Sequence, residues 1–225
     1  MNKLNILKTE RGILFKGLFF YNWKFIAKLY HHISLSNENI SMTVDQFLEQ
    51  FQWLDPVTQR IKIFEAVRDF PYQINGKTTA EELLDAKEWY CAAKHKLLKE
   101  CYTKLGYETE LCFTPFMFRL IYLPEHLKNR GLADKRVYHS FLRFKMNDAR
   151  ISLDATFHPA MKDVYAVNEN RDGISDQRDI SAYSNVSIAR TPEEEIEIKK
   201  ELSEELDSED MRWIEEYNAW IKTFK

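Results

Sequence analysis

The chain has 225 residues, of which 44% are hydrophobic and 30% charged, and its formal net charge is −3. This length and composition exclude a disordered chain and favour one globular domain with additions, because a core of ordinary size forms without disulfides or metals. The small negative charge gives no bulk attraction to phosphate, so we expect no nucleic-acid partner.

The N-terminal part, residues 1–55, is expected to be an accessory segment of mixed helix and strand. Its aromatic-rich stretch, residues 12–30, is interrupted by Lys16, Lys24 and Lys28, so no run of about 18 apolar residues spans a membrane. We favour core packing for this stretch, and a helix lying in a membrane surface is the alternative. The three cysteines show no disulfide-framework spacing, which indicates a reducing, cytoplasmic compartment.

Two helices are predicted before the first turn. Apolar spacing predicts a helix over residues 43–54, and Pro56 stands at the first position of a second helix. That helix should end before Pro71, because the residue before a proline avoids the helical region. Asn75-Gly76 then predicts a turn.

The next helix carries the first cysteine. Thr79 caps it, and periodicity without Gly or Pro continues to residue 105, where Gly106 ends the helix. Cys91 and His95 share one face of this helix, but the chain offers no matching spacing for two further ligands. We therefore expect neither metal nor cofactor, with His95 partly exposed.

Strands are predicted over residues 107–116, 119–123, 135–146 and 150–157, with a loop and one short helical turn between the second and the third. Asn147-Asp148 predicts a two-residue hairpin turn. In that register His139 and Asp154 lie on one face, close enough for a hydrogen bond. We expect Cys112 to face inward and His158 to lie in a surface turn.

The C-terminal part, residues 166–225, is predicted as a polar loop followed by helices that pack on the core. Thr191 caps the first helix, and an apolar stripe follows Ser208 in the second. Residues 191–210 contain ten Asp or Glu and two Lys, which favours an acidic surface helix over a functional acidic tail.

The order of Cys91, His139 and Asp154 resembles that of the transglutaminase-like superfamily of papain-like cysteine enzymes. The resemblance covers about residues 60–160, through "VRDFPYQI", "TTAEELLDAKEWYCAAKHKLLKECYTKLGY" and "YHSFLRFKMNDARISLDATF". It implies an α+β fold with a core over residues 56–165, in which a helix carrying the cysteine packs on an antiparallel sheet. It also implies that the long helix breaks between Ala86 and Tyr90. The chain departs from the family pattern at Trp89, where Gly is usual, and in the residues after His139.

By this resemblance Cys91 is the nucleophile, His139 the general base and acid, and Asp154 the orienting carboxylate. The implied activity is acyl transfer on a peptide or protein amide through a thioester, as an amidase, protease or transglutaminase. Trp89 and Tyr72 are expected to line the substrate cleft. The alternative is a catalytically silent interaction module whose cleft is closed by Trp89 and Tyr90.

Overall fold

The computed structural model describes residues 42–75, 80–85, 89–169, 172–176 and 185–224, all of which belong to one unit, residues 41–225. The aromatic-rich stretch and Thr79 lie outside the described residues, so the expectations for them stay predictions. Within the described part, no helix has the length and apolar character that crossing a membrane requires.

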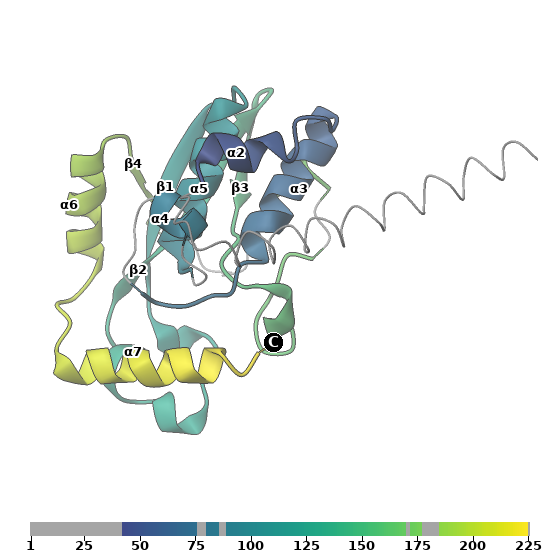
Figure 1. Cartoon of the computed structure of the whole chain (residues 1–225). Helices are drawn as coiled ribbons and strands as arrows, with labels where there is room; N and C mark the ends of the chain where they lie inside the picture. Colours follow the sequence, from purple (N-terminus) through teal and green to yellow (C-terminus); the bar gives the residue numbers. More distant parts are fainter. Residues whose placement is uncertain (1–41, 76–79, 86–88, 170–171, 177–184, 225) are drawn as a thin grey trace, which may run out of the picture. The chain divides into compact units, whose positions relative to one another are not determined.

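Four antiparallel strands form one sheet in the order β3-β2-β1-β4 (Figure 1). Their bounds are Thr109–Phe116 for β1, Val137–Met146 for β2, Ala149–Leu153 for β3 and Ser187–Ala189 for β4. The strand predicted over residues 119–123 is wrong, because Phe118–Leu120 forms a short 3-10 helix, η1. β4 was not predicted, since three residues are too few to show an alternating pattern.

The β2–β3 hairpin has the predicted register. Met146 lies opposite Ala149, and Asn147 adopts a φ of 55°, the left-handed conformation that asparagine tolerates in tight turns. The pairing ends at Leu142 and Leu153, although β2 begins five residues earlier, at Val137. The first part of β2 therefore has an edge that β3 does not cover.

The described residues also form six α-helices. Their bounds are Val44–Glu49 for α2, Pro56–Arg68 for α3, Ala80–Asp85 for α4, Cys91–Lys104 for α5, Pro192–Leu202 for α6 and Ser208–Ile221 for α7. Three more 3-10 helices are η2, Glu125–Leu127, η3, Gly131–Ala133, and η4, Pro159–Met161. The loop after residue 123 thus holds two such turns rather than the one predicted.

The prediction of one continuous helix over residues 79–105 is wrong, because α4 ends at Asp85 and α5 begins at Cys91. Just before α5, Trp89 forms a parallel bridge with Tyr72, in which Gln73 N donates to Trp89 O at 2.8 Å. The break implied by the family resemblance is therefore present. At the other end, Gly106 has a φ of +88° and follows α5, as predicted.

The fold is α+β, with helices packed on the four-stranded sheet. α5 packs on β1 and β2, and α3 packs on α5. The apolar stripe of α7 is buried against the connection between β1 and β2, where Trp213 Nε1 donates to Leu127 O at 2.9 Å. At Gly131, φ is +49° and a Cβ atom would lie 2.9 Å from the Cβ of Trp213, so α7 docks closely there.

Candidate functional site

Cys91 is the first residue of α5, as the resemblance implied. Its N-cap residue, Tyr90, makes no hydrogen bond from its side chain to the first turn. The thiol therefore lies at the helix end that carries free N–H groups and the positive end of the helix dipole, which favour a thiolate. The residue is 6% exposed.

His139 and Asp154 are in direct contact. His139 Nε2 lies 2.7 Å from Asp154 Oδ2, and both residues are buried. The other carboxylate oxygen, Oδ1, accepts hydrogen bonds from Thr156 N at 3.0 Å and Thr156 Oγ1 at 2.6 Å. The Asp-Ala-Thr sequence thus gives the carboxylate its own donors two residues along the chain, which keeps it ionised and oriented.

The Cys91 thiol and the His139 imidazole each shift the pKa of the other. Burial alone would raise the pKa of the Cys91 thiol. The hydrogen bond to His139, the charge of that imidazole and hydrogen bonds from Ser140 together bring the pKa below its usual 9.0.

The imidazole has the opposite shift. Burial alone would lower the pKa of His139, but the negative charge of Asp154 and the hydrogen bonds to Asp154 and Cys91 raise it to about 10. Burial would raise the pKa of Asp154, yet the charge and hydrogen bond of His139 hold it well below its usual range. A raised imidazole pKa and a lowered thiol pKa both favour the imidazolium–thiolate form of this pair.

The other two cysteines have different surroundings. Cys101 and Cys112 are both fully buried, and Cys112 lies on β1 as an inward-facing residue. Burial raises the pKa of each thiol, to about 11 for Cys112. Of the three, only Cys91 has a thiol whose pKa is lowered.

Two histidine predictions are wrong. His95 is 0% exposed rather than partly exposed, and His158 is buried rather than in a surface turn. Their neighbour Lys94 is also 0% exposed, and its Nζ donates to Arg68 O and Thr156 O, each at 2.9 Å. The sequence "KHK" suggests an exposed helix face, whereas the first two of its residues point into the protein.

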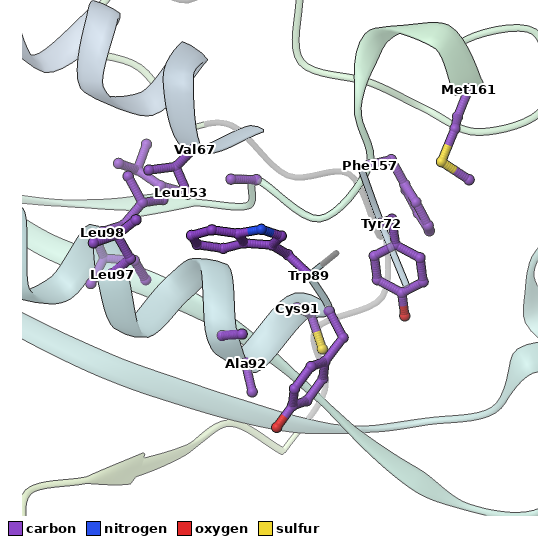
Figure 2. Packing of buried hydrophobic residues seen from close by; sticks show 14 of the residues in the cluster. Val67, Tyr72, Trp89, Cys91, Ala92, Leu97, Leu98, Leu153, Phe157 and Met161 are labelled. Carbon is purple, nitrogen blue, oxygen red and sulfur yellow. The ribbon is translucent and has the colours of Figure 1, made fainter. Parts of the chain in front are cut away.

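Trp89 and Tyr72 were predicted to line the substrate cleft. The indole of Trp89 is 0% exposed and stacks on Phe70 with ring centroids 4.1 Å apart. Figure 2 shows this indole extending toward Val67, Leu98 and Leu153, which gives it a packing role.

Figure 2 shows the Tyr72 ring beside that of Phe157, and the two ring centroids are 5.5 Å apart. Burial and, next, the negative charge of Cys91 raise the pKa of the Tyr72 phenol. Contact of Trp89 or Tyr72 with a substrate stays a prediction.

Across the described ranges, no group of three or more His, Cys, Asp or Glu side chains is arranged to hold a metal ion. Comparison of the chain with protein-family models, with curated proteins and with solved structures found no match.

Proposed function

We propose that the protein is a cysteine-dependent acyl-transfer enzyme of the transglutaminase-like, papain-like kind. The observation that supports the proposal is the buried 2.7 Å hydrogen bond between His139 Nε2 and Asp154 Oδ2, together with the lowered pKa of the Cys91 thiol, which His139 lowers more than any other neighbour does. A lowered thiol pKa and a raised imidazole pKa both favour the charged pair needed for catalysis, a thiolate beside an imidazolium.

In the proposed reaction, the Cys91 thiolate attacks the carbonyl carbon of an amide, and a C–S bond forms. As the C–N bond breaks, His139 gives its proton to the leaving amine, and a thioester remains on the sulfur. Water or a second amine then attacks the thioester while His139 accepts the proton of the attacking group. The C–S bond breaks, and the thiolate and imidazolium are restored.

Asp154 has a supporting part in this scheme. Its hydrogen bond to Nε2 holds the imidazole with Nδ1 toward the sulfur, and its charge stabilises the imidazolium. The helix-start N–H groups around Cys91 are suitable donors for the oxyanion of a tetrahedral intermediate. These roles follow from the same contacts and need no further group.

The experiment is to trap the acyl-enzyme. Glutaminyl and other peptide amides are incubated with the protein, and intact mass spectrometry looks for an adduct that hydroxylamine removes. We expect the adduct on the wild type and not on Cys91→Ala. The matched control is Cys112→Ala, a buried cysteine on β1, which should retain the adduct.

One observation favours the alternative, a silent interaction module: Cys91 is only 6% exposed. The two functions are separated by a small reagent that needs no substrate recognition. Iodoacetamide at pH 6 should label Cys91 much faster than Cys101 or Cys112, and His139→Ala should remove most of this advantage. Equal labelling of all three thiols would support the silent module and contradict the enzyme.

A further inference from the structure

Two further side chains, Ser140 and His95, lie against the three proposed catalytic residues. Ser140 follows His139 on β2, and His95 lies one turn after Cys91 on α5. Both are 0% exposed. The mechanism proposed above uses neither of them, and a buried histidine that meets a buried serine beside a reactive thiol calls for a physical reason.

The hydrogen bonds of His95 fix where its proton lies. Its Nε2 accepts the backbone N–H of Ala155 at 2.8 Å. A backbone N–H can only donate, so Nε2 carries no proton and the imidazole is neutral. Burial, which lowers the pKa of His95 more than its neighbours raise it, has the same effect. The single ring proton is therefore on Nδ1.

The position of the proton on Nδ1 decides which of two neighbouring contacts of His95 is a hydrogen bond. The 3.4 Å approach of His95 Nε2 to Asp154 Oδ1 joins two acceptors, so it is not a hydrogen bond in the neutral state. Nδ1–H, on the other side of the ring, lies 3.4 Å from Ser140 Oγ and donates to it. The hydroxyl oxygen of Ser140 is thus an acceptor toward His95, and its own proton is directed elsewhere.

The uncovered edge of β2 shows where the other groups of Ser140 point. Lys145 N donates to Glu108 O, on the β1 side of the strand, so the even-numbered N–H groups of β2 point toward β3. At Ser140 the paired part of β3 has already ended, at Leu153. The Ser140 N–H therefore points past the end of β3, and it is one of the groups that lower the pKa of the Cys91 thiol.

Hydrogen bonding from the backbone and from the side chain of Ser140 is among the causes that lower the pKa of the Cys91 thiol. We therefore assign the hydroxyl proton of Ser140, which His95 does not accept, to the Cys91 sulfur. The donors then run in one direction: Ala155 N–H to His95, His95 Nδ1–H to Ser140, and Ser140 Oγ–H to the sulfur. In a buried site, hydrogen bonds aligned in this way polarise one another. This run of donors ends on the sulfur from a direction that does not involve His139.

We propose that Ser140 and His95 form a second hydrogen-bonded arm of the site, in which the neutral tautomer of His95 turns the Ser140 hydroxyl toward Cys91 and stabilises the thiolate. In this scheme the Ser140 hydroxyl donates to the reacting sulfur, so Ser140 is a catalytic residue. His95 acts through Ser140 and is a positioning residue. The inference rests on the proposed function, since it concerns the same thiolate.

The test is the rate of iodoacetamide labelling of Cys91 in the full chain between pH 4 and 9, followed by peptide mass spectrometry. We expect Ser140→Ala to move the midpoint of the rate profile to higher pH and to slow labelling at pH 6 about tenfold, the effect of losing one hydrogen bond to a charged sulfur. His95→Phe should shift the profile in the same direction. The control is Ser152→Ala, the same change at a buried serine of β3, which should leave the profile unmoved.

The double variant separates positioning from packing. If His95 acts through Ser140, His95→Phe adds nothing to the shift caused by Ser140→Ala, because the donor it positions is already absent. Additive shifts would overturn the role of His95, and an unmoved profile for Ser140→Ala would overturn the whole arm. Should His95→Phe fail to fold by circular dichroism, the result for Ser140→Ala alone decides whether the arm exists.

The outcomes also distinguish this inference from the proposed function. Fast labelling of Cys91 that depends on His139 but not on Ser140 would leave the enzyme proposal standing and remove the second arm. Slow labelling of Cys91 in the wild type, equal to that of Cys101, would contradict both.

Discussion

The imidazole of His139 and the carboxylate of Asp154 share a 2.7 Å hydrogen bond between Nε2 and Oδ2, in surroundings closed to solvent on both sides. A buried pair of this kind is costly to break by changing one partner, because the other is left without its counter-charge. The relationship governs the protonation of the whole site, since each member sets the charge state of the other.

Asp154→Asn should reduce formation of the acyl-enzyme by about 10⁴-fold, because the amide no longer supports an imidazolium or the required tautomer. The pKa of His139 should fall, since the Asp154 charge is what raises it. Single-turnover kinetics and an NMR titration of His139 measure the two effects. Asp176→Asn is the control, because Asp176 accepts the N–H of Ser152 at 2.6 Å and its change should leave both quantities as they are.

Activity should be lost as the pH rises through about 10, where His139 gives up its proton and can no longer protonate the leaving amine. The free energy of unfolding should also depend on pH through His139. Its folded pKa of about 10 exceeds the unfolded value of about 6.5, so its contribution is complete below pH 6.5 and is lost between there and about 10.

Urea unfolding of the wild type and of His139→Gln at pH 6, 8 and 10 tests this. We expect the difference in unfolding free energy between them to shrink steadily with pH. A difference that stays constant across this range would show that the imidazole is not protonated in the folded protein.

At acid pH the protein should lose stability because His158 becomes protonated. Burial, with the nearby charge of Lys94, lowers the pKa of His158 to about 4. The folded state therefore binds this proton less readily than the unfolded state. The contribution of the neutral side chain is complete above about pH 6.5 and is lost as the pH falls toward 4.

His158→Gln, which keeps an acceptor for the N–H of Tyr72, should lose less stability than the wild type between pH 6.5 and 4.5. Urea titrations at the two pH values measure the loss. His126→Gln, at an exposed histidine of η2, is the control and should behave as the wild type does. Equal acid sensitivity of all three proteins would contradict the prediction.

The docking of α7 should depend on Gly131. Gly131→Ala combines a left-handed backbone, φ +49°, with a Cβ atom 2.9 Å from Trp213, and we expect it to cost about 2–4 kcal/mol of unfolding free energy. Gly106→Ala has the same kind of backbone strain, φ +88°, but no atom within 4 Å of the new Cβ, and should cost about 1 kcal/mol. Thermal or urea unfolding of both variants measures the difference, and equal costs would mean that Trp213 moves aside freely.

The hairpin and its two site residues were predictable because the information is local. A two-residue turn fixes the register of β2 and β3, and parity then brings His139 to Asp154. The cap at Thr191 likewise predicted the start of α6. These features depend on residues close together along the chain.

Contacts between residues far apart along the chain could not be predicted from the sequence. Lys94 and His95 are buried because carbonyl and amide groups some sixty residues away meet them, and nothing in "KHK" signals those partners. The break before Cys91 interrupts a sequence with good helical periodicity, so only the family resemblance indicated it. The apolar residues near Leu120 suggested a strand, but among the described residues no strand pairs with them, and they form a 3-10 helix.

The ammonium of Lys94 joins three segments, since it extends from the first turn of α5 to the last carbonyl of α3 and to the backbone of Thr156. The segment bearing Cys91 and the segment bearing Asp154 are thereby fastened together, and separating them would leave a buried charge without its oxygens. Amide hydrogens in the first turn of α5 and in residues 154–158 should therefore exchange with solvent through one shared opening event. Access to the sulfur then requires the side chains around it to move, while the framework beneath stays closed.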